Sequence, residues 1–245
     1  TAAHLVIDLR DNTNLTDVGL IALSRSIPPR LQRLDLDLNG ATSFTDAGLR
    51  CLAERLPQAA ARLRLDFGWN DGFTDSGLAA LAARIPSAVS HLSLSFTWSG
   101  AFTDAGFGVL AARVPRGLLE LSLDFECSKG LTDASLCALD AGFSALAARI
   151  PPGVTRLSLD FNDNTSITDV GLRALASALP PALTALKLHF KRNALFTEAA
   201  LQALAERVPR GAAELTLNFR GRTSIRPSDR HQAVHAMQSA PFDIF

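Results

Sequence analysis

The sequence predicts an α/β solenoid, a right-handed horseshoe in which a curved parallel sheet of about eight strands lines the concave face and helices cover the convex face. Three observations predict this fold. A Thr-Asp dipeptide returns at a fixed spacing, a pattern of alternating leucines returns in step with it, and the residues after each Thr-Asp have the apolar spacing of a helix. A regular period of this length is the signature of stacked strand–helix units.

The Thr-Asp dipeptide sets the period of the chain. Successive copies are 29 residues apart, except for one step of 36 residues. The copies begin at Thr16, Thr45, Thr74, Thr103, Thr132 and Thr168, and a Thr-Glu variant begins at Thr197. The chain is therefore a stack of one small unit, and its fold and partner class follow from that unit.

Strict alternation of apolar residues predicts one short strand in each unit. Leu5-x-Ile7-x-Leu9 is the first copy, and from the third copy onward the last apolar residue is Phe. Alternation with period two is typical of a strand with one buried face. The expected strands are residues 5–9, 34–38, 63–67, 92–96, 121–125, 157–161, 186–190 and 215–219.

The residues after each Thr-Asp predict a helix that is buried on one side. From Thr74 to Pro86 the apolar residues fall at i, i+3, i+4 and i+7. The threonine is a good N-cap, the aspartate suits the positive end of the helix dipole, and the proline ends the helix. A glycine recurs near five of the helix starts, where it costs about 1 kcal/mol of helix propensity; these residues are Gly19, Gly48, Gly77, Gly106 and Gly171. Its recurrence indicates that neighbouring backbones approach closely there.

These units predict one domain that spans residues 1–245, with residues 220–245 as a C-terminal cap. The 36-residue repeat, around residues 121–156, holds seven extra residues that continue the apolar stripe through Leu136, Leu139, Phe143 and Leu146. Seven residues add roughly two turns, so we expect one elongated helix in this repeat. The extension is either a tolerated duplication or a projecting contact for a partner.

The repeat resembles a known family. Leu31-x-x-Leu34-x-Leu36-x-x-Asn39 is similar to the leucine-rich-repeat signature, and the unit of a strand plus a full helix resembles the ribonuclease-inhibitor-like class. The half that begins with Thr-Asp-x-Gly-Leu resembles repeats of F-box substrate receptors. Phe ends most strands of this chain, which suggests that an aromatic spine replaces the polar ladder usual in the family. The resemblance implies a protein partner, with the chain acting as a scaffold or a subunit of a larger assembly. The alternative that it implies is the substrate-recognition segment of an F-box-type ubiquitin ligase.

Composition excludes several other classes. The 24 basic and 24 acidic residues give zero net charge, which argues against general nucleic-acid binding. No apolar run approaches the roughly 20 residues of a membrane-spanning helix. Three cysteines without a CxxC motif favour a reducing intracellular compartment, either the cytoplasm or an organelle interior after removal of a targeting peptide. The chain starts at Thr1, which indicates a processed protein or a fragment.

The sequence gives no sign of catalysis. It contains no phosphate-binding glycine loop, no GxSxG motif and no HExxH motif, so we expect neither an enzyme nor a cofactor. His231 and His235 are four residues apart, as two zinc ligands on a helix would be, but no third ligand accompanies them. We therefore expect no metal site.

Outward-facing residues of the strands are the first candidate binding residues. Equivalent positions of successive strands form columns with a spacing of about 4.8 Å. One column is acidic over much of its length, and basic residues flank it and become frequent toward the end of the chain. The columns form either a solvated ladder of mixed charge or a docking surface for a partner. The candidate residues are Arg33, Asp37, Arg62, Arg64, Asp66, Asp124, Asp160, Lys187 and His189.

Two tryptophans are the second candidate. Trp69 and Trp98 are 29 residues apart, so they occupy the same place in adjacent repeats, just past the strand. Two exposed neighbouring tryptophans would form a binding hot spot. The alternative is a local lid in which the two rings fold over Phe67 and Phe96.

Overall fold

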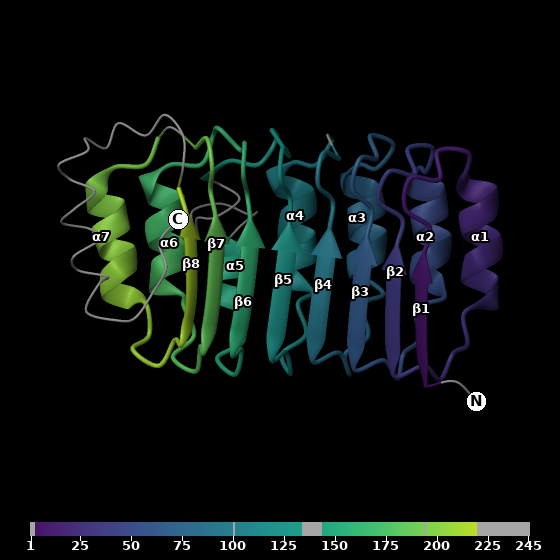
Figure 1. Ribbon diagram of the computed structural model, residues 1–245, viewed down its shortest axis with the longest axis horizontal. Helices are drawn as coiled ribbons and strands as arrows, with labels where there is room; N and C mark the ends of the chain where they lie inside the picture. Colours follow the sequence, from purple (N-terminus) through teal and green to yellow (C-terminus); the bar gives the residue numbers. More distant parts are fainter. Residues whose placement is uncertain (1–2, 100, 134–143, 194, 220–245) are drawn as a thin grey trace.

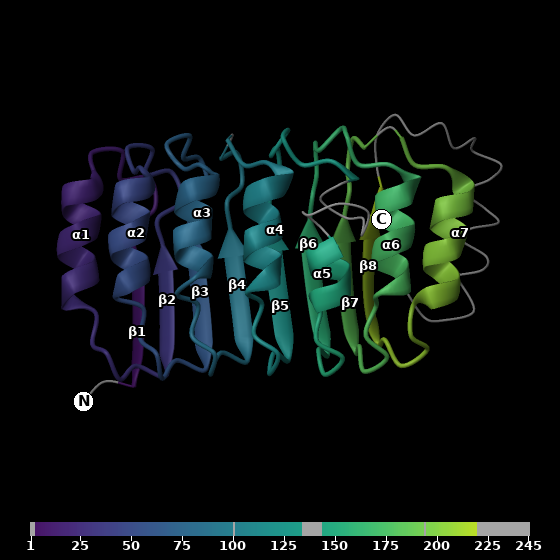
Figure 2. The ribbon, with the colours of Figure 1, turned by 180° about the vertical axis from the view of Figure 1, so that it is seen from behind.

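The computed structural model describes residues 3–99, 101–133, 144–193 and 195–219. Within these residues, eight parallel strands form one open curved sheet, and the helices pack side by side on one of its faces (Figures 1 and 2). The strands are β1 His4–Asp8, β2 Arg33–Asp37, β3 Arg62–Asp66, β4 His91–Ser95, β5 Glu120–Asp124, β6 Arg156–Asp160, β7 Ala185–His189 and β8 Glu214–Asn218. The helices are α1 Asp17–Ser26, α2 Asp46–Glu54, α3 Asp75–Ala82, α4 Asp104–Ala112, α5 Ser144–Arg149, α6 Asp169–Ser177 and α7 Glu198–Arg207.

The predicted solenoid is confirmed. Each strand pairs with the next in chain order, and residues at the same place in the repeat are partners, as Leu34 and Leu63 are. Each strand begins one residue before the leucine pattern predicted. The pattern's last residue, such as Phe67, lies just past the strand but continues its hydrogen bonding, because Phe67 N–H donates to the Ser95 carbonyl at 2.9 Å. The sheet is therefore fixed in register from end to end.

An aromatic spine fills the core under the carboxyl ends of the strands. We use this name for the six phenylalanines Phe67, Phe96, Phe125, Phe161, Phe190 and Phe219. Most neighbouring rings of the spine contact each other, with centroids 5.6 Å apart for Phe67 and Phe96 and 5.8 Å apart for Phe161 and Phe190. Between Phe125 and Phe161 the contact runs through Phe107, whose centroid lies 4.9 Å from that of Phe125 and 5.9 Å from that of Phe161. The first five members of the spine are fully buried, so the aromatic spine predicted from the sequence is confirmed.

The expectation that this spine replaces a polar ladder is wrong. A polar ladder of buried Asn and Ser side chains also runs along the loops, through Asn70, Ser99, Ser128, Asn164 and Asn193. Asn70 Nδ2 donates to the Ala41 carbonyl of the preceding repeat at 2.8 Å, and Asn193 Nδ2 donates to the Phe161 carbonyl at 3.0 Å. The ladder stands three residues after each phenylalanine, two places later than the family signature puts its Asn. Its own 29-residue recurrence was the signal that could have revealed it.

Two ladder positions give a matched test of this role. Asn70→Ala should lower the free energy of unfolding by about 1–3 kcal/mol, because it leaves the buried Ala41 carbonyl without its donor. Ser128→Ala should be neutral or slightly stabilising, because the Ser128 hydroxyl is buried and finds no hydrogen-bond partner among the residues that the structure describes. Urea denaturation of both variants checks the contrast. Equal losses would show that the ladder acts through packing alone.

The predicted threonine caps are confirmed in the middle of the solenoid. The hydroxyls of Thr45, Thr74, Thr103 and Thr168 accept from the backbone N–H two residues later. Thr16 and Thr197 begin their helices without this side-chain bond, so the expectation of a cap at every copy is wrong at those two positions.

The aspartate of each Thr-Asp has a larger role than the helix dipole suggested. Asp46 accepts from both the backbone N–H and the hydroxyl of Thr74 in the next repeat, at 2.8 and 2.6 Å. We call this arrangement the Thr–Asp clamp. It recurs between Asp17 and Thr45, Asp75 and Thr103, Asp104 and Thr132, Asp133 and Thr168, and Asp169 and Thr197. The motif therefore joins repeats to one another as well as starting helices.

The clamp explains the glycine near the starts of α2, α3 and α4. A Cβ added to Gly77 would lie 2.2 Å from Oδ1 of Asp46, and one added to Gly48 would lie 2.3 Å from Oδ1 of Asp17. The close neighbour is thus the clamp aspartate of the preceding repeat, and the expectation of close backbones is corrected. In α7 Ala200 takes the glycine's place, and there the Thr197 hydroxyl makes no cap bond.

Two predicted elements lie outside or partly outside the described residues. The structure describes α5 and the Thr132–Asp133 start of the elongated repeat, but residues 134–143 between them lie outside the described part. The predicted cap at 220–245 also lies outside it. Among the described helices, none combines the length and the hydropathy that a membrane span requires.

Candidate functional site

The face of the sheet opposite the helices is open (Figure 1), and alternate residues of each strand point toward it. Because the strands pair in register, these side chains form the predicted columns. The carboxyl-end column is Asp8, Asp37, Asp66, Ser95, Asp124, Asp160, His189 and Asn218. The middle column is Val6, Asp35, Arg64, Ser93, Ser122, Ser158, Lys187 and Thr216. The amino-end column is His4, Arg33, Arg62, His91, Glu120, Arg156, Ala185 and Glu214.

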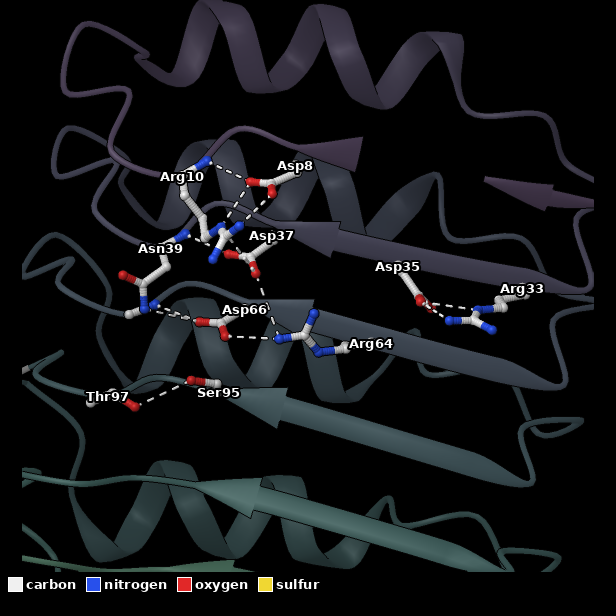
Figure 3. A network of polar contacts seen from close by, with 11 residues as sticks. Asp8, Arg10, Arg33, Asp35, Asp37, Asn39, Arg64, Asp66, Ser95 and Thr97 are labelled. Atoms are coloured by element: carbon white, nitrogen blue, oxygen red, sulfur yellow. Dashed lines mark hydrogen bonds and ion pairs between the residues drawn. The ribbon is translucent and has the colours of Figure 1, made fainter. Parts of the chain in front are cut away.

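Arginines bridge the first carboxylates of the carboxyl-end column (Figure 3). Arg10 pairs with Asp8 at 2.7 Å and lies 3.9 Å from Asp37. Arg64, from the middle column, lies 3.6 Å from Asp37 and 3.4 Å from Asp66. Such partly exposed pairs contribute only about 0–1 kcal/mol each, so they hold the arginines in place without strongly stabilising the fold. Three predicted binding residues, Asp37, Arg64 and Asp66, therefore belong to one network.

Arg33 is engaged within its own strand. Its Nε donates to Oδ2 of Asp35 at 3.0 Å, and Asp35 is only 7% exposed (Figure 3). The other oxygen of Asp35 is buried and has no hydrogen-bond partner in the described part of the chain. Arg33 thus offsets the charge of a buried carboxylate, and this pairing limits what it can offer to a partner.

The later part of the carboxyl-end column holds carboxylates in an unfavourable setting. Burial raises the pKa of Asp124, and the neighbouring Asp160 and Asp66 raise it further. Burial also raises the pKa of Glu126, with added repulsion from Asp160 and Asp124. Within the described part of the chain, the only basic side chain that pairs with the Asp160 carboxylate is His189, whose Nδ1 lies 3.3 Å from Oδ2 of Asp160. This stretch therefore favours a cationic neighbour.

The pair of His189 and Asp160 predicts a pH dependence of stability. The hydrogen bond to Asp160 raises the pKa of His189 above its ordinary value of about 6.5. Since the folded pKa exceeds the unfolded one, the stabilisation is fully present below about pH 6.5 and is lost as the pH rises through the folded pKa. We expect wild type to lose stability relative to His189→Gln as the pH rises above about 6.5, measured by urea denaturation. An NMR titration that gives His189 a pKa below 6.5 would contradict this expectation.

A basic hollow of about 440 Å³ lies over the amino ends and middles of the strands. Its lining includes the three small side chains Ser93, Ser122 and Ser158, the acidic residues Asp35, Glu120 and Glu214, and a larger number of basic residues, namely Arg33, Arg62, Arg64, His91, Arg156 and Lys187. Arg156 is paired, at 3.8 Å from Glu120 and 3.1 Å from Glu214. Arg62 and Lys187 are exposed and make no ion pair within the part of the chain that the structure describes.

The two tryptophans lie on the surface and stack on each other. Their ring centroids are 5.1 Å apart and their planes differ by 8°. Trp69 is 53% exposed and Trp98 is 44% exposed, whereas Phe67 and Phe96 beneath them are fully buried. The rings thus have the surface position that the hot-spot alternative requires.

The loop after each strand places the tryptophans at a special backbone position. Trp69 and Trp98 have φ of 63° and 55°, in the left-handed region. The same conformation recurs through a loop column of Asp11, Gly40, Trp69, Trp98, Cys127, Asp163 and Arg192. This region costs a non-glycine residue roughly 1–2 kcal/mol, and a large aromatic side chain there is unusual. Sequence analysis missed this strain, although the glycine at position 40 was a signal for it.

One cluster in the loops has the composition of a metal site. Single ligand atoms of Glu126, Cys127 and Asp163 lie within 4.8 Å of one another. Burial raises the pKa of Cys127 to about 11, so its thiol stays protonated, and Asp163 is paired with Arg192 at 3.1 Å. Metals bind the thiolate, so this geometry does not favour one. His231 and His235 lie outside the described residues.

Comparisons with known proteins concern the repeat and the fold. A family model described as Leucine Rich repeat matches residues 3–24, 63–82 and 157–176. A leucine-rich repeat-containing protein of known structure, LegL7 from Legionella pneumophila, is 18% identical, covering 90% of this chain and 67% of that chain, with a TM-score of 0.47. A chain of the Rad7 and Elc1 complex in yeast is 18% identical, covering 98% of this chain and 68% of that chain, with a TM-score of 0.50. No curated protein sequence matches. The likeness to the yeast structure is one of fold.

Proposed function

We propose that this leucine-rich-repeat protein is a non-enzymatic protein-binding module, either a scaffold or a subunit of a larger assembly. It binds its partner through the concave face of the sheet and the strand-to-helix loops. Leucine-rich repeats point to protein–protein interaction. The observation that carries the proposal is the basic hollow, an open depression with a floor of small serines and with Arg62 and Lys187 free of ion pairs among the described residues.

The hollow suits a protein partner for two physical reasons. Serines at the centre of the middle column leave room for side chains of a partner to reach the sheet. Arg62 and Lys187 can each form charge-assisted hydrogen bonds with a partner's carboxylates without breaking an existing ion pair. The carboxyl-end column carries the opposite charge, so the sheet has an electrostatic polarity that would orient the partner.

Affinity purification with mass spectrometry tests the proposal. We expect the wild-type chain to retain a stoichiometric protein partner from cell extract, and the variant Arg62→Glu/Lys187→Glu to lose at least about nine-tenths of it. The matched control is Arg84→Glu/Arg113→Glu, which makes the same change in charge at two exposed positions just after α3 and α4. Equal retention by both variants, with unchanged thermal unfolding, would overturn the assignment to the hollow.

The substrate-recognition segment of an F-box-type ubiquitin ligase is the alternative function. It rests on the resemblance of the Thr-Asp half of the repeat to such receptors. It predicts that ubiquitin-ligase components accompany the purified chain and that the captured partner becomes ubiquitylated. A stable complex without either feature would support the scaffold or subunit function instead.

A further inference from the structure

The stacked tryptophan pair leaves one indole face open. The two rings lie parallel, one repeat apart, so the second face of Trp69 is turned toward the preceding repeat. That repeat holds Gly40 in the loop column, and the repeat before it holds Asp11. The loops lie side by side, because Asp11 N–H donates to the Asn39 carbonyl at 2.8 Å and Gly40 N–H donates to the Gly68 carbonyl at 2.9 Å. No side chain at position 40 therefore covers Trp69.

Position 40 thus leaves a gap beside Trp69, and Asp11 lies on the far side of it. A Cβ added to Gly40 would lie 2.6 Å from Oδ1 of Asp11, so the carboxylate reaches over the glycine in the direction of Trp69. Asp11 is exposed, and within the described ranges its carboxylate makes no ion pair or side-chain hydrogen bond. Asp11 and Trp69 are two repeats apart, about 10 Å at the spacing of neighbouring strands. Since residue 40 is glycine, the intervening loop adds no side chain between them.

The charge around the gap is acidic. Asp8, Asp37 and Asp66 stand at the ends of the same three strands, and Arg10 and Arg64 are already paired with them (Figure 3). A cation entering the gap would therefore meet a carboxylate at Asp11 and an attractive π-face at Trp69. Guanidinium fits better than ammonium, because it is flat, stacks on aromatic rings and donates in its plane to a carboxylate.

We propose that Asp11, Gly40 and Trp69 form a slot for an arginine side chain of a basic segment of the partner protein. The guanidinium stacks on the open face of Trp69 and pairs with Asp11 above Gly40. Trp98 supports Trp69 from behind and holds its ring in place. The proposal rests on the proposed protein-binding function and names the chemistry of one part of the partner. It also accounts for a tryptophan in a backbone conformation that glycine would adopt without strain.

Intrinsic fluorescence provides a direct test, because the chain has two tryptophans and no tyrosine. The probe is a capped tri-arginine peptide, titrated into the full chain at low ionic strength. We expect a saturable change in emission, with binding at least about five-fold weaker for tri-lysine. Asp11→Asn should weaken tri-arginine binding about five-fold or more. The matched control Asp163→Asn removes the same charge at the equivalent position of a distant repeat and should leave the affinity unchanged.

Two further variants address the slot itself. Gly40→Asn tolerates the left-handed backbone and fills the gap, so it should abolish the response to tri-arginine. Trp69→Gly should abolish binding measured by calorimetry without lowering the thermal transition, because it relieves strain. Equal affinity for the arginine and lysine peptides, a stronger response to an aromatic or acidic tripeptide, or undiminished binding by Asp11→Asn would each overturn the proposal.

The slot and the proposed function can fail separately. Full partner capture by Trp69→Gly and Gly40→Asn would leave the protein-binding function standing and remove the slot from it. If the chain binds tri-arginine specifically but captures no protein, the slot is supported and the proposed protein-binding function is contradicted.

Discussion

Phe96→Ala is expected to lower the free energy of unfolding by about 3–5 kcal/mol, among the largest losses that a single truncation in this core can cause. Phe96 is fully buried at the middle of the aromatic spine. Its ring lies 5.6 Å from that of Phe67, 5.5 Å from that of Phe125 and 5.0 Å from that of Phe102. Truncation leaves a cavity that the rigid repeats on either side cannot close.

Phe96→Leu is the control for this prediction. It keeps most of the buried apolar volume and should cost roughly 1–1.5 kcal/mol. Urea denaturation followed by circular dichroism measures both variants. If Phe96→Ala costs less than about 1.5 kcal/mol, the spine does not couple the repeats in the way its ring contacts imply.

Gly106→Ala is expected to destabilise the protein by about 2 kcal/mol, although alanine favours helix by about 1 kcal/mol. A Cβ there would lie 2.1 Å from Oδ1 of Asp75 and 2.8 Å from its Cβ. Asp75 accepts from the backbone N–H and the hydroxyl of Thr103, at 2.9 and 2.5 Å. Either this Thr–Asp clamp or the start of α4 must shift, with the loss of one or more hydrogen bonds.

A double-mutant cycle separates the clash from other effects of Gly106→Ala. Asp75→Ala removes the carboxylate and leaves only the Cβ contact of 2.8 Å, so Gly106→Ala should cost less in this background than in the wild type. Gly117→Ala is the matched control, because a Cβ there meets no atom within 4 Å, and it should change stability by less than about 0.5 kcal/mol. Additive losses in the cycle would rule out the clamp as the cause.

The periodic parts of the fold were open to prediction because they depend on local pattern. Alternation at Leu63 and Leu65 identifies a strand with one buried face, and the apolar stripe after Thr74 identifies a helix. Because the repeat is regular, equivalent residues of successive units must lie side by side. This requirement predicted the columns on the sheet and the neighbouring positions of Trp69 and Trp98. The identity of the outward residues, and hence the candidate surface, followed from the same register.

The contacts between repeats were not open to prediction in the same way. The Thr-Asp pattern predicted a role for Asp46 at the start of its own helix, whereas its carboxylate binds Thr74 of the next repeat. The recurrence of glycine predicted that two backbones approach closely at Gly77, whereas the close neighbour there is the side chain of Asp46. The polar ladder through Asn70 was overlooked because its hydrogen bonds join two loops that only packing brings together.

Local pattern along the chain is enough to predict the period, the strand and helix of each unit, the aromatic spine and which residues face outward. What those residues contact emerges only when the repeats are stacked: the partner of each clamp aspartate, the left-handed loop column, the ion pairs that occupy Arg33 and Arg64, and the exposure of the stacked Trp69 and Trp98. The physical reason is that hydrophobic periodicity fixes which face of a unit is buried, whereas the offset and rotation between successive units depend on side-chain packing across the whole stack.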